Sequence, residues 1–304
     1  MPEMPDVLIY LEAIERYAVD QVLKKVRIYR PFVLRTFDPP IDSAEGHRLV
    51  GVKRMGKRLA LRFEGDLHIV IHLMIAGRML WSEKPPAKPN KMHQASFEFE
   101  HGTLVLTEAG TKRRASIHVV SEADGLAALD PGGIDPITAT SKQFAAALLA
   151  ENRTLKRALT QPNRFSGIGN AYSDEILFEA RLSPLRLTTS LSEDDIERLR
   201  IATRDTLTHW IEKLRSEFGE RFPGMGEVTA FREDFNVHGR FGKPCRVCGM
   251  PIQRIVHSEN EINYCARCQN QDRVLADRAL SRLLKSDWPT AFLLYYNDEI
   301  HSDD

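Results

Sequence analysis

Residues 245–268 read CRVCGMPIQRIVHSENEINYCARC and contain all four cysteines of the chain. The cysteines form two C-x₂-C pairs, Cys245 with Cys248 and Cys265 with Cys268, with sixteen residues between the pairs. Two residues between thiolates let one tight turn direct both sulfurs at one ion, and two such turns complete the tetrahedron that zinc prefers. We therefore expect one zinc ion. Because sulfur fills all four positions, this zinc holds structure and activates no water.

The alternative for these cysteines is a pair of disulfides or four free thiols in a core. It fits less well, because a cytosolic chain rarely keeps disulfides and paired C-x₂-C turns match metal geometry better. Zinc alone does not name a substrate, since a zinc finger can serve nucleic acid, a protein partner or its own fold.

The bulk composition is that of a globular protein. The chain has 304 residues, enough for two domains, with 42% hydrophobic and 28% charged residues. No apolar run approaches the roughly 20 residues that span a bilayer. The start, MPEMPDVLIYLEAIERY, lacks the basic and apolar regions of a secretory signal. These features predict a cytoplasmic location.

The net charge is zero, with 42 basic and 42 acidic residues, which does not favour a strongly electrostatic nucleic-acid binder. Basic residues nevertheless gather in three places: residues 53–58, residues 112–114 and the surroundings of the cysteines. A neutral total is compatible with a basic face. Ordinary solvated charge explains the same clusters equally well.

The pattern of apolar residues predicts an α+β protein of several domains. Residues 1–125 combine an amphipathic helix over about residues 5–22 with short alternating segments that mostly end near glycine, which is typical of an antiparallel sandwich. Residues 126–140 contain two prolines and two glycines and are expected to form a linker. About four helices are predicted in residues 141–222, the zinc finger region in 223–273, and a C-terminal extension in 274–304 that contains a helix packed on the body.

The N-terminus is a candidate reagent. Methionine before a small residue is normally removed, which exposes the secondary amine of Pro2, whose pKa should lie near about 7.7–8.0. Such an amine can attack C1′ of a deoxyribose, expel the base and form an iminium ion. Glu3 can protonate the sugar ring oxygen, and Lys57 can anchor a phosphate or sugar oxygen. Taken alone, however, Pro2 is usually a harmless terminal residue.

Five separated elements give this terminus a context. The MPEMPDV start, GKRLAL, HLMIAGRM, GIGNAYSDEIL and the two cysteine pairs together resemble the formamidopyrimidine-DNA glycosylase and endonuclease VIII family of base-excision repair enzymes. The resemblance covers residues 1 to about 270. It implies a β-sandwich domain, a helix-two-turn-helix domain and a zinc finger. It also implies that Pro2 is the nucleophile, Glu3 the acid and Lys57 an essential partner.

The same resemblance implies contacts with DNA. A base must leave the duplex before an amine can reach its sugar, and side chains inserted into the stack offset part of that cost. The family places a methionine, an arginine and a phenylalanine there. The matching positions are Ile75, Arg113 or Arg114, and Ala115, so the aromatic wedge is missing.

Phosphate contacts are expected at the GIGN turn, where Gly169 and Asn170 open a helix whose N–H groups can hold a phosphate, with a further contribution from Lys156. An ordinary glycine turn with a helix cap explains this turn alone. Two departures concern the surroundings of the damage pocket. Asn260 replaces the arginine that usually grips phosphate, without its charge, and Asp6 replaces a glutamate.

The leading functional hypothesis is therefore a monomeric, bifunctional enzyme that binds damaged double-stranded DNA in the nucleoid. It excises damaged, oxidised bases through an imine with Pro2 and then nicks the abasic site. Two alternatives stay open: a glycosylase for bulky or crosslinked adducts, and a non-catalytic protein that recognises damaged DNA.

Overall fold

The computed structural model describes residues 1–229, 231–257 and 260–275, and the chain divides into two compact units. The first unit comprises residues 1–148, 159–169 and 203–230, and the second comprises 149–158, 170–202 and the chain from 231. Each unit thus combines separate stretches of sequence, and helix α6 (Glu193–Phe218) contributes residues to both. Among the described residues, no helix is both long and apolar enough to cross a membrane.

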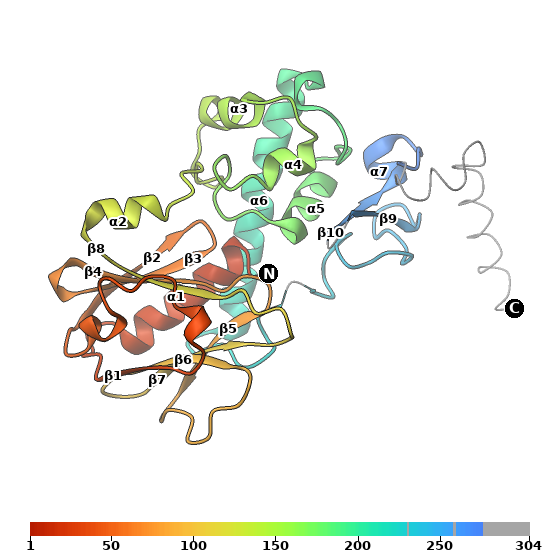
Figure 1. The fold of residues 1–304 in the computed structure, drawn as a ribbon. Helices are drawn as coiled ribbons and strands as arrows, with labels where there is room; N and C mark the ends of the chain where they lie inside the picture. Colours follow the sequence, from red (N-terminus) through yellow and green to blue (C-terminus); the bar gives the residue numbers. More distant parts are fainter. Residues whose placement is uncertain (230, 258–259, 276–304) are drawn as a thin grey trace, which may run out of the picture. The chain divides into compact units, whose positions relative to one another are not determined.

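The first unit contains a β-sandwich of two antiparallel four-stranded sheets, which Figure 1 shows in red to yellow. One sheet has the strand order β1-β6-β7-β5 and the other β2-β3-β4-β8. The bounds are β1 (Lys25–Ile28), β2 (Leu49–Met55), β3 (Arg58–Phe63), β4 (Leu67–His72), β5 (Gly77–Ser82), β6 (His93–Glu98), β7 (Thr103–Glu108) and β8 (Ser116–Ser121). Three short 3₁₀ turns are η1 (Pro31–Val33), η2 (Ile41–Ala44) and η3 (Glu64–Asp66). The predicted sandwich is confirmed.

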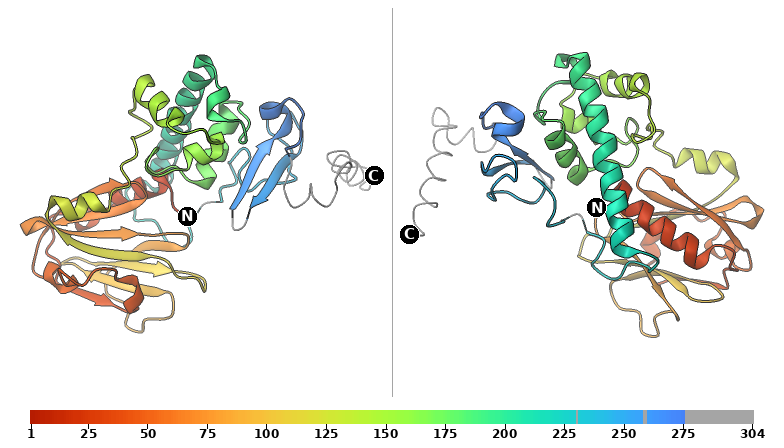
Figure 2. Two further views of the ribbon diagram at one scale, coloured as in Figure 1. Left: turned by 45° about the horizontal axis from the view of Figure 1, so that its top comes forward. Right: turned by 180° about the vertical axis from the view of Figure 1, so that it is seen from behind.

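The core of this unit lies between the sheets, and every strand contributes buried apolar residues to it. Leu59 and Leu61 of β3 and Leu104 and Leu106 of β7 are fully inaccessible. Helix α1 (Met4–Ala18) packs against β2 and β3 and adds its apolar stripe to the same core, and Figure 2 shows it beside the sheets. Strand β4 is buried along nearly its whole length, because helix α2 (Glu122–Ala128) covers its outer face.

The helices that follow occur where the sequence predicts them. They are α3 (Ser141–Leu149), α4 (Leu155–Leu159) and α5 (Asn170–Glu179), followed by η4 (Thr188–Ser190) and α6. In the second unit, α5 precedes the hairpin of β9 (Ile252–His257) and β10 (Asn260–Cys265) and the short helix α7 (Ala266–Asn270). Contacts between α5 and β10 join the helical part to the zinc finger region.

Three details differ from the sequence prediction. Residues 126–128 of the predicted linker are helical, as the end of α2. Helix α1 ends at Ala18, before the predicted end, because Val19 is extended and Asp20 adopts a left-handed φ of 67°. Of the extension, Val274 and Leu275 pack on the cluster around Tyr264, and the remainder of its predicted helix lies outside the described residues.

Candidate active site and nucleic-acid interface

The residues before α1 are held in place by backbone hydrogen bonds. The N–H of Glu3 donates to Oδ2 of Asp6 at 2.9 Å, and the N–H of Met4 donates to the carbonyl of Gly167, also at 2.9 Å. Pro2 is buried, and the side chain of Glu3 is only 2% exposed. The start of the chain is therefore an ordered part of the first unit. Asp6, shorter than glutamate, is the N3 residue of the helix, and its side chain accepts the N–H of the N-cap residue Glu3 as in a capping box.

The charged ends of Glu3 and Lys57 meet at Gly169. The N–H of Gly169 donates to Oε2 of Glu3 at 2.6 Å. A Cβ atom built on Gly169 would lie 2.4 Å from Nζ of Lys57 and 2.6 Å from Oε1 of Glu3. The ammonium and the carboxylate are thus within about 5 Å of each other. Lys57 reaches this point from the two-residue turn between β2 and β3, in which Gly56 has a φ of 60°. A side chain at position 169 would therefore displace the ends of Lys57 and Glu3.

Burial lowers the pKa of the chain-terminal amine of Met1, and the nearby cations of Arg78 and Lys57 act in the same direction, against the carboxylates of Glu3 and Asp6. Desolvation disfavours the charged form of an amine. An amine in this environment is therefore more often neutral, which is the form that attacks carbon.

His72 is a neighbour of this site that the sequence prediction missed. It ends β4 and pairs in register with Arg58 on β3, directly after Lys57. Burial, together with the charges of Arg58 and Lys57, lowers its pKa to about 4. The ring is neutral at pH 7 and can donate or accept one hydrogen bond. The available signal was a polar residue at the end of an apolar strand, but its partner depends on the register of β3 and β4.

The two predicted wedge loops belong to the first unit. Ile75 lies in the tight turn between β4 and β5 and is 54% exposed. Arg113 and Arg114 lie in the loop between β7 and β8, and both are exposed. Ala115 is only 3% exposed, because its N–H and that of Arg114 donate to the buried carboxylate of Glu108. Glu108, which the sequence prediction also missed, therefore fixes the end of this loop.

In the second unit, Lys156 and Asn170 are joined to each other. Nζ of Lys156 donates to the carbonyl of Asn170 at 2.6 Å and to Oδ1 of Asp174 at 2.5 Å, and the lysine is 5% exposed. The side-chain amide of Asn170 donates to the carbonyl of Glu261 at 2.9 Å. The geometry thus gives Lys156 a role in holding the start of α5, besides any contact with phosphate.

Two adjacent acids on α5 anchor the residues that precede the zinc finger. Oδ2 of Asp174 lies 2.8 Å from Nδ1 of His238 and accepts the N–H of Asn263 at 3.2 Å. Glu175 accepts the backbone N–H groups of residues 236–238 at 2.7 to 2.9 Å. Burial raises the pKa of Glu175, although these hydrogen bonds oppose the shift. Both acids are buried, and buried carboxylates need hydrogen-bond partners, which this network supplies.

The four cysteines fit one zinc ion. Their sulfurs all lie within 4.8 Å of one another, with Cys245 to Cys268 at 3.9 Å and Cys248 to Cys265 at 3.4 Å. A tetrahedron with zinc–sulfur bonds of about 2.3 Å has sulfurs about 3.8 Å apart. The N–H of Cys265 donates to Gln269, whose amide donates to the carbonyl of Leu182. The predicted structural zinc is confirmed. Asn260 begins β10, and its side chain lies outside the described part of the structure.

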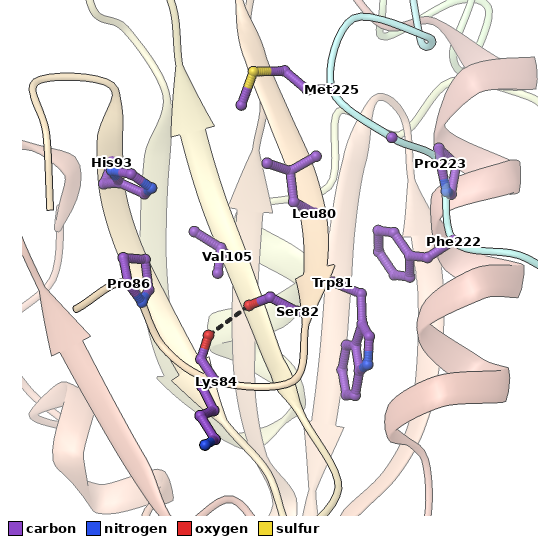
Figure 3. A pocket seen from close by; sticks show the side chains of 11 residues that line it. Leu80, Trp81, Ser82, Lys84, Pro86, His93, Val105, Phe222, Pro223 and Met225 are labelled. Carbon is purple, nitrogen blue, oxygen red and sulfur yellow. Dashed lines mark hydrogen bonds between the residues drawn. The ribbon is translucent and has the colours of Figure 1, made fainter. Parts of the chain in front are cut away.

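A hollow of about 470 Å³ on the sandwich contains none of the predicted site residues (Figure 3). Leu80 and Val105 form its floor on the face of β5 and β7 that points away from the core, and the segment from Phe222 to Met225 forms one wall. Its lining is mostly apolar.

A zinc finger, a helical segment and a β-sandwich with an ordered N-terminus define a class of multidomain zinc protein. Family models match all three parts: the formamidopyrimidine-DNA glycosylase N-terminal domain over residues 1–116, the H2TH domain of the same enzyme over 133–219, and the zinc finger found in FPG and IleRS over 242–271. The formamidopyrimidine-DNA glycosylase of Moorella thermoacetica is 30% identical over 84% of this chain and 94% of its own length. That of Geobacillus kaustophilus is 32% identical over 88% and 100%.

Solved structures agree with these relatives. The crystal structure of MutM (Fpg) from Thermus thermophilus has a TM-score of 0.74 and 29% identity, covering 88% of this chain and 98% of that one. Lactococcus lactis Fpg with DNA containing an abasic site has a TM-score of 0.78 at 23% identity, covering 88% and 99%, which shows the fold. The chain belongs to the formamidopyrimidine-DNA glycosylase family. It is a member of a family of DNA glycosylases that repair damaged DNA.

Proposed function

We propose that the protein is a bifunctional DNA glycosylase and abasic-site lyase that uses Pro2 as its nucleophile. The observation that carries the proposal is the convergence of Glu3 and Lys57 on Gly169, beside a buried N-terminus. The partner is damaged double-stranded DNA. The relatives described above are named as DNA glycosylases, and we take the class of reaction from their names.

The chemistry begins after removal of Met1. The lone pair of the Pro2 amine attacks C1′ of the damaged nucleoside, the C1′–N bond breaks with its electrons on the leaving base, and the proton lost by the proline nitrogen neutralises that base. Glu3 protonates the ring oxygen O4′ as the sugar opens, so that an iminium ion forms between Pro2 and C1′. Lys57, a compact point charge, is placed to neutralise a phosphate or sugar oxygen.

The second reaction uses the same covalent intermediate. The iminium ion acidifies the hydrogens at C2′, and loss of one of them expels the 3′ phosphate, which nicks the strand. Water then releases the sugar fragment and regenerates the Pro2 amine. A secondary amine suits this sequence because its iminium ion carries a permanent positive charge, which withdraws electrons at every step.

We propose an oxidised base as the lesion, as the name formamidopyrimidine-DNA glycosylase of the 30–32% identical relatives suggests. One observation favours a second candidate, a bulky adduct: the position of the expected aromatic wedge is Ala115, whose side chain is a single buried methyl group. A smaller wedge leaves more space beside the extruded base.

Borohydride trapping tests the mechanism. The methionine-free protein is incubated with duplex DNA containing an abasic site, and borohydride reduces an iminium ion to a stable crosslink. We expect a crosslink with the wild type, none with Pro2→Gly or with an N-terminal extension, and retained DNA binding with Glu3→Gln. Lys57→Ala should lose crosslink formation. The matched control is Lys53→Ala, an exposed residue of β2, which should keep it. A non-catalytic DNA-binding protein would bind the same duplex without any crosslink.

A further inference from the structure

Phe32 is an aromatic side chain with no place in the core. It is 87% exposed, whereas its neighbour Val33 is 3% exposed and anchors the 3₁₀ turn η1. Single exposed apolar residues are common on protein surfaces. A nearly bare phenyl ring on a hydrogen-bonded turn is unusual enough to ask what covers it when the protein is at work.

The turn that carries Phe32 lies beside the start of β8. Leu34 bridges Ile117 in parallel, and the N–H of Arg35 donates to the carbonyl of Ile117 at 2.8 Å. Contacts between η1 and β8, with the parallel bridge of Leu34 to Ile117, place the turn near Ser116, where β8 begins directly after the loop of residues 109–115. Phe32 therefore lies on a turn near the strand end to which the loop predicted to enter DNA is joined.

The surroundings of Phe32 are basic. Five cationic side chains are exposed on the two segments that meet here: Arg30, Arg35, Lys112, Arg113 and Arg114. Such a surface complements the phosphate backbone of DNA, and a ring among cations suits stacking on a base. An apolar surface of a protein partner would remove water from these charges and offer them no hydrogen bonds, which is unfavourable.

The side chain at the wedge position at the end of this loop, Ala115, is too short to enter a base stack. Ala115 is 3% exposed and is held against the strand by Glu108, so its methyl group cannot enter a base stack. We propose that Phe32 acts in its place as a DNA-stacking residue, on the bases next to the extruded nucleotide, while the basic loop holds the flanking phosphates. The inference rests on the proposed function, because it needs damaged duplex DNA as the ligand.

Phe37 provides a matched control. It is 82% exposed, but it lies after Thr36, whose hydroxyl accepts the N–H of Val119, and it is followed by the acidic Asp38. It is thus an equally exposed phenylalanine farther along β8 from the basic loop. Phe32→Ala, Phe37→Ala and Phe32→Trp should unfold at the same temperature as the wild type, because both rings are outside the core.

The test measures binding of the full chain to a duplex that carries a stable abasic analogue with 2-aminopurine as the neighbouring base. We expect Phe32→Ala to weaken binding about tenfold and to raise the 2-aminopurine fluorescence of the complex, because the quenching ring is gone. Phe32→Trp should restore both, and Phe37→Ala should change binding less than twofold. Unchanged binding and fluorescence in Phe32→Ala, or equal losses in both alanine variants, would overturn the proposal.

The outcome is separable from that of the proposed function. If the wild type forms no borohydride crosslink yet binds DNA in a Phe32-dependent way, the catalytic proposal is wrong and the stacking role stands. If crosslinking is normal and Phe32→Ala binds like the wild type, only the stacking role is wrong. A wild type that does not bind the duplex would overturn both.

Discussion

Gly169 has no room for a side chain, because the ends of Lys57 and Glu3 occupy the space that a Cβ atom would need. We predict that Gly169→Ala lowers the rate of crosslink formation on the order of 100-fold, since displacing reacting groups by about 1 Å has effects of that size. Single-turnover trapping measures this rate. Gly51→Ala is the control, because its nearest neighbour is an arginine nitrogen 4.0 Å away. Equal rates in the two variants would show that the geometry at Gly169 is unimportant.

His72 makes a second prediction at this scale. Its pKa in the folded protein is about 4, below the ordinary value of 6.5, so the unfolded chain takes up a proton at a higher pH than the folded one. The contribution of His72 to the free energy of unfolding should therefore be fully present above pH 6.5. It should decrease as the pH drops from 6.5 toward 4. Urea unfolding at several pH values measures this, and His72→Asn should reduce the slope. A His72 ring that titrates near pH 6.5 by NMR would contradict the prediction.

The residues found and missed by sequence reasoning differ in one respect. Pro2, Glu3 and Lys57 belong to local motifs whose chemistry is visible in a few letters. The register of β3 and β4 places His72 opposite Arg58, and Glu108 accepts the N–H of Arg114 in the loop that follows its own strand. Neither contact has a sequence signal. The role that we propose for Phe32 has no local signal either, since it depends on the pairing of Leu34 with Ile117 near the start of β8.

Among the elements, α5 depends on a buried ion pair between Lys156 and Asp174, whose side chains are 6% and 0% exposed. We predict that Asp174→Asn costs about 3–5 kcal/mol of unfolding free energy, because it leaves a buried ammonium without its counter-charge. It should also weaken DNA binding, because Lys156 positions the Asn170 carbonyl. Urea unfolding and DNA titration measure the two effects.

The matched control is Asp205→Asn, which breaks an exposed pair with Arg204 and should change stability by less than about 1 kcal/mol. If both variants are equally stable, the buried pair contributes nothing specific. Many of the elements were predictable: apolar periodicity indicated α1, α3, α4, α5 and α6, and short alternating segments indicated the antiparallel sandwich. The pairing order and register of the strands were not predictable, because they depend on contacts between segments far apart in the sequence.

At the scale of the whole molecule, the linear order of predicted domains corresponds to two units that each draw on three stretches of chain. Composition located the change from strands to helices near residue 125, but it could not show that residues 203–230 return to the sandwich. That return is made by side chains: Leu214 and Phe218 enter the sandwich core, and Arg215 pairs with Glu12 at 2.6 Å. Long-range packing of this kind has no local signature in the sequence.

The zinc site tests whether the two units lose structure separately. None of its ligands comes from the sandwich, whereas Asn263 and Glu261 on the same hairpin contact Asp174 and Asn170. Because binding of the metal contributes directly to folding, we predict that chelation, or Cys268→Ser, lowers one calorimetric unfolding transition and leaves that of the sandwich in place. DNA binding should fall at least tenfold.

Val247→Ser is the matched control, since Val247 lies between two ligands in the same turn, is 59% exposed and offers no sulfur. It should bind zinc and DNA like the wild type, and adding zinc back should restore the chelated protein but not Cys268→Ser. If chelation shifted both transitions together, the sandwich would not unfold independently of the metal. If it shifted neither, the four cysteines would hold their geometry without zinc, contrary to the cost of burying four thiols around an empty centre.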